Sequence, residues 1–206
     1  MADIPAWPRL IGDTRGIAMV EMSLIIGLLL ALTLGMVDFS FAFAQWNAAS
    51  KATQMLARLA AVSDPVSSDL QTLTGVEGGA APGDPMPDFG EHMCSGATQT
   101  CTNGTYDPAA MTDLIDRAID ETNLDSILPQ LTAANVVIRY TYTGLGFAGR
   151  PGVAGRPGGP VPTITVELTG LNFNLFFLNG LMGFGPIQIP PMTTTVTGED
   201  LSTVWS

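Results

Sequence analysis

Positively charged side chains are scarce in this sequence. Its 206 residues include eight Lys and Arg against 19 Asp and Glu, which gives a net charge of −11. A protein that binds nucleic acid through its phosphates needs a basic surface, so the composition excludes that class of partner. Charged residues make up only 13% of the chain, which also has 23 Gly and 15 Pro. This balance indicates a loop-rich domain with a soluble exterior.

The sequence also lacks the motifs of common enzymes. It has one histidine, and it contains no GxSxG, no phosphate-binding glycine loop and no HExxH. His92 lies beside Glu91 and close to Cys94, but these side chains fall short of the four ligands that a structural zinc ion takes. We therefore expect no enzymatic activity, no metal site and no cofactor.

Cysteine is almost absent, and the two cysteines lie close together in a polar stretch. Cys94 and Cys101 are separated by SGATQT. In an exported loop such a pair is typical of a disulfide, and a pair of free thiols is the alternative. The closed loop is short, so the expected stabilisation is about 2–3 kcal/mol.

The most distinctive feature is an apolar stretch with a carboxylate near its start. Gly16 follows Arg15, Glu21 comes five residues after this glycine, and no charge occurs again before Asp38. A carboxylate inside a membrane-spanning helix is expensive, so it calls for a functional reason. The spacing predicts a prepilin-type processing site with cleavage after Gly16, which would make Glu21 the fifth residue of the mature chain.

This stretch resembles the TadE-like family, whose members are pilin-like proteins of tight-adherence (Flp/Tad) pili. The matching positions are Arg15, Gly16, Ala18, Val20, Glu21 and Leu24, followed by the pair Ala57 and Arg58. The sequence departs from the family pattern at Met22, which replaces an aromatic residue, and at Gly27, where many members have proline.

The resemblance implies a structural minor pilin or pseudopilin that acts in pilus assembly, surface adhesion and biofilm formation. The partners it implies are a prepilin peptidase, the pilus assembly machinery and other pilin-like subunits. Ile17 would be the new N-terminus, and Glu21 would pair with its freed amine on a neighbouring subunit. That pairing neutralises two charges in a medium where an unpaired charge is costly.

Residues 17–44 are long and apolar enough to cross a membrane. As a helix they extend about 42 Å, against about 30 Å for the hydrocarbon core. Glu21 and Asp38 would lie about 25 Å apart, near opposite interfaces. Because a disulfide belongs in an oxidising compartment, we expect a single-pass protein of the bacterial inner membrane with a cytoplasmic N-terminus and a periplasmic C-terminal domain.

Two other readings remain open. The segment is also compatible with a stable anchor of an envelope protein that binds a partner through its exterior domain. Alternatively, the small residues at 42 and 44 fit a signal-peptidase site, which would release a secreted protein cut after Ala44.

The remaining pattern predicts an α+β protein. We expect a cytoplasmic leader over residues 1–16, a transmembrane and extended pilin-like helix over 17–62, and a periplasmic or extracellular domain over 63–206. The long helix would end at Asp64 and Pro65 and be about 69 Å long.

The domain is predicted to contain a second helix and a short antiparallel sheet. The helix begins after Asp107, which is its N-cap, with Pro108 at the first helical position. Strands are predicted at 136–143, 163–169 and 192–197. A long loop over 63–106 and a mobile hairpin loop over 149–160 complete the pattern.

One further segment, 171–189, is apolar but interrupted by Asn, Gly and Pro. We expect it to cover the sheet or to form an apolar contact surface, and a second membrane span is the alternative.

Overall fold

The computed structural model describes residues 15–152, 158–173, 175–183, 185–199 and 201–202. The chain divides into two compact units. The first consists of Met1–Ala42 and Asn174–Pro186, and the second of Phe43–Phe173 and Ile187–Ser206. In this division a C-terminal segment joins the N-terminal helix in the first unit. The regions 1–16, 17–62 and 63–206 remain predictions.

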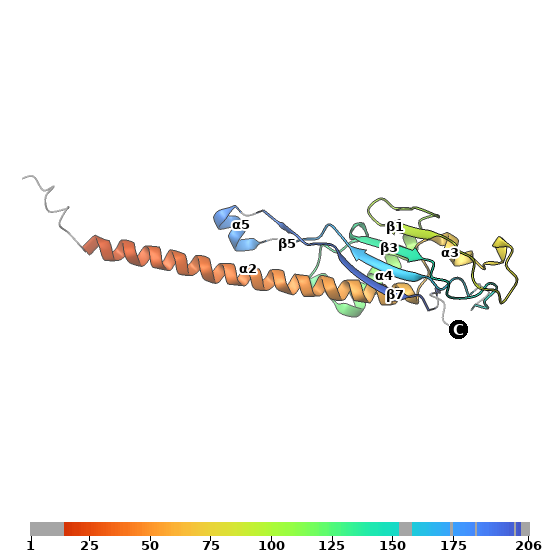
Figure 1. Cartoon of the computed structure of the whole chain (residues 1–206). Coiled ribbons are helices and arrows are strands. Elements are labelled where there is room, and N and C mark those ends of the chain that lie inside the picture. The colour runs from red at the N-terminus through yellow and green to blue at the C-terminus, as the bar shows by residue number, and fades with distance from the viewer. Residues whose placement is uncertain (1–14, 153–157, 174, 184, 200, 203–206) are drawn as a thin grey trace, which may run out of the picture. The chain divides into compact units, whose positions relative to one another are not determined.

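A single long helix, α2 (Arg15–Ala61), opens the described part of the chain and contributes to both units (Figure 1). Its 47 residues contain no proline, and its bounds agree with the predicted helix over 17–62. In the first unit its large apolar side chains are exposed, from Ile17 to Phe41. In the second unit Ala49, Ala52 and Leu56 are fully buried, so this part of α2 belongs to a core.

The second unit is built on a five-stranded antiparallel sheet with strand order β2-β1-β3-β4-β7 (Figure 1). The strands are β1 (Glu91–Ser95), β2 (Thr100–Cys101), β3 (Val136–Thr141), β4 (Thr163–Leu168) and β7 (Met192–Thr197). A separate two-stranded ribbon pairs β5 (Asn172–Phe173) with β6 (Ile187–Gln188). The predicted α+β class is therefore confirmed.

Short helices fill the connections. They are α3 (Ser68–Thr72), α4 (Pro108–Thr122), α5 (Phe176–Met182) and the 3₁₀ turns η1 (Val76–Gly78), η2 (Leu124–Ser126) and η3 (Ala133–Asn135).

The sheet has one buried and one polar face. Inward side chains alternate along β3 and β4, so that Ile138 pairs with Val166 and Tyr140 with Ile164. The outward positions carry residues such as Arg139 and Thr165, which is the alternation expected of a sheet solvated on one side. Helix α4 adds Met111, Leu114, Ile115 and Ala118 to the buried residues.

Helix α4 begins as the sequence predicts. The carboxylate of Asp107 accepts hydrogen bonds from the backbone N–H groups of Ala109 and Ala110 at 2.9 and 3.2 Å. Pro108, which has no N–H, occupies the first turn, where no intrahelical partner exists for one. The helix ends at Asn123, whose left-handed backbone is tolerated by an asparagine side chain.

The sheet is larger than predicted, because part of the predicted loop over 63–106 is a strand. Glu91–Ser95 pairs with β3 over its whole length, with His92 and Cys94 facing inward. These five residues include no β-branched or aromatic side chain, so local propensity gave no strand signal. Pairing with the apolar β3 and the link to β2 stabilise it instead. Residues 153–157 of the predicted 149–160 loop lie outside the described part.

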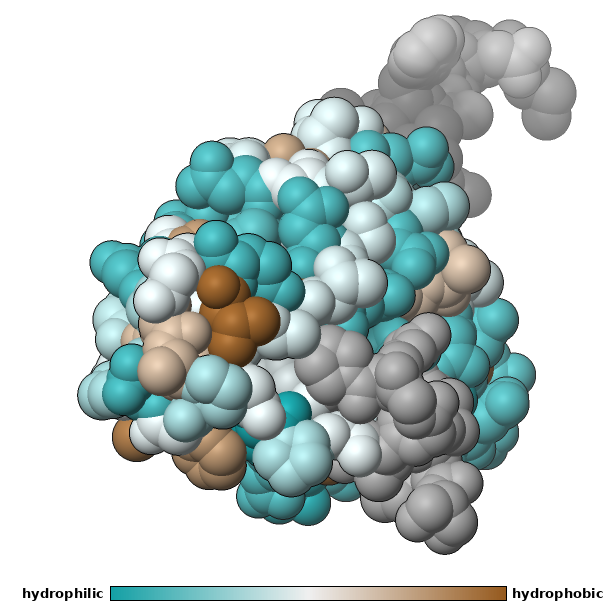
Figure 2. Space-filling model, turned by 90° about the vertical axis from the view of Figure 1, so that its right-hand side faces the viewer, coloured by the Kyte–Doolittle hydropathy of each residue, from teal (hydrophilic) through white to brown (hydrophobic). Residues whose placement is uncertain are grey.

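Cys94 and Cys101 form the predicted disulfide. They lie directly opposite each other on β1 and β2, so the bond closes the short hairpin at the edge of the sheet. Figure 2 shows that the visible face of the molecule at this end is largely hydrophilic, with small isolated hydrophobic spots.

The disulfide should stabilise the second unit by restricting its unfolded chain. In the variant Cys94→Ala/Cys101→Ala, we expect the free energy of unfolding to fall by about 2–3 kcal/mol. Urea titration of the full chain in mild detergent, followed by circular dichroism, measures this. Reduced wild-type protein is the matched control and should show the same loss. An unchanged midpoint in both samples would contradict a stabilising role.

His92 is buried, and both of its ring nitrogens have a hydrogen-bond partner; we describe the neutral ring. Its Nε2 lies 3.3 Å from the Phe89 carbonyl oxygen, which can only accept, so this nitrogen donates. Nδ1 then accepts from the Ser67 hydroxyl at 2.9 Å. Burial lowers the pKa of His92 below its ordinary value, although the Phe89 carbonyl and the charge of Asp69 oppose this shift.

The lowered pKa of His92 makes the fold sensitive to acid. The unfolded chain binds a proton at this residue at higher pH than the folded chain does, so stability is full above about pH 6.5 and falls as the pH drops through that value. We expect His92→Gln, which does not titrate, to lose less stability between pH 7.5 and pH 5 than the wild type. Urea midpoints at the two pH values test this, and equal pH dependence in both proteins would refute it.

Candidate processing and assembly site

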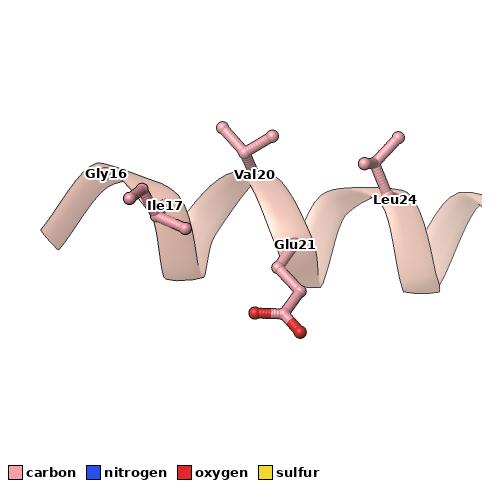
Figure 3. A pocket seen from close by; sticks show the side chains of 5 residues that line it. All are labelled: Gly16, Ile17, Val20, Glu21 and Leu24. Atoms are coloured by element: carbon pink, nitrogen blue, oxygen red, sulfur yellow. The ribbon is translucent and has the colours of Figure 1, made fainter. Parts of the chain in front are cut away.

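The predicted site residues come together on the first two turns of α2. Gly16, Ile17, Val20, Glu21 and Leu24 line a shallow open groove of about 510 Å³ in the first unit. All five belong to one helix, so the groove is exposed helix surface and no enclosed pocket. Figure 3 shows Val20 and Leu24 pointing to one side of the helix, while Glu21 points away from them.

Glu21 has no partner of its own. Within the described residues, its carboxylate makes neither a hydrogen bond nor an ion pair, and its side chain is exposed. Its immediate neighbours in the groove are apolar, and Val20 and Leu24 are 62% and 71% exposed. The carboxylate therefore lies on exposed helix surface, on a different side of α2 from Val20 and Leu24 (Figure 3).

Gly16 is not required by packing in this structure. A Cβ atom placed on it would meet nothing within 4 Å, and its backbone is helical. Glycine within a helix costs about 1 kcal/mol relative to alanine. The structure of the chain therefore gives no reason for glycine here, and a requirement imposed by a processing enzyme is compatible with that.

Two hydroxyl groups in the helix that follows this site are hydrogen-bonded within the helix itself. The Thr33 hydroxyl donates to the carbonyls of Leu29 and Leu30, both at 3.0 Å, and the Ser40 hydroxyl donates to Met36 at 2.8 Å. Such bonds remove the cost of placing hydroxyl groups in hydrocarbon. The stretch is long and apolar enough to cross a membrane, and its most apolar part is not buried within the chain.

Asp38 has a role that the sequence did not reveal. The sequence predicts only that it lies near a membrane interface, and in the structure it is 3% exposed. Its carboxylate accepts hydrogen bonds from the backbone N–H groups of Phe176, Phe177 and Leu178 at 3.1, 3.0 and 2.8 Å. These partners lie 138 to 140 residues away in the sequence. The sequence pointed to this contact only through a carboxylate late in an apolar helix.

The other predicted residues belong to the second unit. Cys94 and Cys101 belong to the second unit, and His92 lies in the same sheet. Among the described residues, no group of three or more His, Cys, Asp or Glu side chains is arranged to hold a metal ion.

Comparison with known proteins agrees with the pattern of the N-terminal segment. Residues 16–58 match the model of a family described as TadE-like protein. This match covers the groove, the apolar stretch and the pair Ala57 and Arg58. Neither the curated proteins nor the solved structures include a significant match to the chain. The resemblance found in the sequence is confirmed over residues 16–58, where the chain is similar to the TadE-like family.

Proposed function

We propose that this protein is a minor pilin or pseudopilin of a tight-adherence (Flp/Tad) pilus. It acts as a structural subunit in pilus assembly, surface adhesion and biofilm formation, and it is not an enzyme. The observation that carries the proposal is the unpartnered carboxylate of Glu21, five residues after Gly16 in a segment that matches the TadE-like family.

The first step is processing by a prepilin peptidase. Hydrolysis of the peptide bond after Gly16 leaves a new amino group on Ile17. The exposed start of α2 and the absence of packing around Gly16 are compatible with access by such an enzyme. The cut creates a positive charge four residues before Glu21.

The second step is assembly. In the membrane, lipid covers the exposed apolar side chains of α2, and in a filament the helices of neighbouring subunits replace the lipid. The Ile17 amine of one subunit then pairs with Glu21 of the next. The pairing offsets the cost of both charges, and the requirement for a partner fixes the register between subunits.

The proposed setting is the bacterial inner membrane, with the N-terminus in the cytoplasm and the second unit in the periplasm. The disulfide supports this orientation, because such bonds persist in oxidising compartments. The pilus assembly machinery and other pilin-like subunits are the proposed partners.

Processing can be read directly from the mature N-terminus. We expect mass spectrometry of membrane fractions from the native host to find a chain that begins at Ile17. In the variant Gly16→Leu, the bulky side chain should keep the peptidase from the bond after residue 16, so this variant should retain its leader. Gly27→Leu, at a helix position with equally open surroundings, is the matched control and should be processed normally.

Other N-termini would replace this proposal with one of the alternatives. A chain that begins at Met1 or Ala2 would indicate a stably anchored envelope protein that binds its partner through the exterior domain. A chain that begins at Gln45 would indicate a secreted protein.

Glu21 should be required for assembly but not for membrane insertion. We expect Glu21→Ala and Glu21→Gln to remain in the membrane fraction and to be lost from sheared pili, because neither side chain neutralises the Ile17 amine. Immunoblots of pilus and membrane fractions measure this.

The matched control for Glu21 is Thr33→Ala. It removes a polar group from the same helix, but one whose hydrogen bonds lie within the helix itself. This variant should enter pili normally. Normal incorporation of Glu21→Gln would show that the carboxylate charge has no part in assembly.

A further inference from the structure

The apolar C-terminal segment contains a helix that packs against α2. Helix α5 lies beside α2 in the first unit (Figure 1), and the chain reaches it from β5 and leaves it through β6. The ring of Phe176 contacts that of Phe41 at a centroid distance of 5.6 Å. The Leu178 side chain lies next to Gly35. Of the two expectations for this segment, α5 agrees with the second, an apolar contact surface.

The contact is held by the Asp38 carboxylate. The first N–H groups of any helix have no partner within that helix, and α5 has no side-chain cap of its own. Asp38 accepts from three of them, so one carboxylate satisfies the start of α5 while these N–H groups stabilise its negative charge.

This arrangement makes α5 compatible with hydrocarbon. In a lipid environment every backbone polar group needs a partner within the protein, and a lone carboxylate is costly. The Asp38 contact meets both requirements at once. The sequence has no charged residue between Glu167 and Glu199, so the whole segment that contains α5 is uncharged.

The exposed surface of α5 continues the apolar surface of α2. Phe176 and Phe177 are 64% and 42% exposed. An open apolar groove of about 400 Å³ runs between the two helices. It is lined by Leu28, Ala31, Leu32, Gly35, Met36, Phe39 and Leu178. Six of these seven residues belong to the part of α2 that is long and apolar enough to cross a membrane.

The position of α5 along α2 favours lipid as the covering partner. Asp38 comes 22 residues after Gly16, which corresponds to about 33 Å along a helix, slightly more than the thickness of the hydrocarbon core. With Gly16 at one interface, Asp38 and α5 lie at the other. Short apolar helices with exposed phenylalanine rings are suited to this boundary between acyl chains and headgroups.

We propose that α5 is a second membrane-contacting element, which lies in the leaflet nearest the second unit and is fastened to α2 by Asp38. Phe176 and Phe177 insert among the acyl chains, which also fill the groove beside Leu178. Asp38 acts as a positioning residue. This proposal depends on the membrane insertion of α2 that is part of the proposed function.

Site-directed spin labelling of the full chain in phosphatidylcholine and phosphatidylglycerol vesicles tests the proposal. The native cysteines are joined in the disulfide, so a cysteine introduced at Phe177 is labelled alone. We expect a ratio of oxygen to aqueous nickel-chelate collisions severalfold higher at position 177 than at Leu145. Leu145 is 48% exposed in the second unit and serves as the aqueous control.

A label at Leu28 reports the insertion of α2 independently. If Leu28 is in lipid and position 177 matches Leu145, the α5 proposal is overturned and the membrane span is not. If position 177 is shielded from both reagents, a second copy of the chain covers α5 and the lipid proposal is wrong. If Leu28 itself is aqueous, both proposals fail.

The role of Asp38 is tested with the same label. Asp38→Ala should shift position 177 toward the aqueous values, and Asp38→Asn, which keeps one acceptor oxygen, should shift it less. Ser40→Ala, on the same helix turn but bonded within α2, is the matched control and should leave the label in place. Label mobility at Leu145 shows whether the second unit stays folded. If the label at position 177 lies at the same membrane depth in folded Asp38→Ala, Asp38 does not position α5.

Discussion

A carboxylate on an apolar helix must find a partner, and the first unit is organised around two such groups. Asp38 finds its partners within the chain, in three backbone N–H groups of α5. Glu21 finds none among the described residues. In both cases an unpaired carboxylate in an apolar environment is costly. The two groups differ in whether the partner comes from the same chain. The internal pair shapes the protein itself, and the open carboxylate suits a contact between subunits.

The same contrast separates the two units. The second unit buries one face of its sheet with α4 and the last turns of α2, and it presents a largely hydrophilic face to the outside (Figure 2). The described part of the first unit has a largely apolar and exposed surface, apart from the stretch of α2 that α5 contacts. A protein with this distribution of polar and apolar surface needs two environments. The sheet domain needs water, and the N-terminal segment needs lipid or other apolar helices. Under the proposed function, a subunit that leaves the membrane for a filament would exchange lipid for the helices of its neighbours, while its sheet domain stays in water.

Much of the fold could be read from local patterns. The apolar run and the absence of proline define α2, while Asp107 and Pro108 mark the start of α4. The alternation in 136–141 and 163–168 gives strands that the structure places side by side. The disulfide followed from the spacing of Cys94 and Cys101. Each of these features depends on residues close in sequence, and so a local rule is sufficient to find it.

The sequence by itself determined the long apolar helix, the α+β class, the TadE-like pattern and the position of Glu21 relative to Gly16. The tertiary structure alone decided that Glu91–Ser95 is a strand, because pairing with its neighbours, above all β3, holds these residues extended. It also decided that Asp38 caps α5. That contact joins residues 138 or more positions apart, and a hydrogen bond between a carboxylate and distant backbone N–H groups leaves no periodicity in the sequence. Long-range pairing is set by the packing of whole elements, which local propensity does not encode.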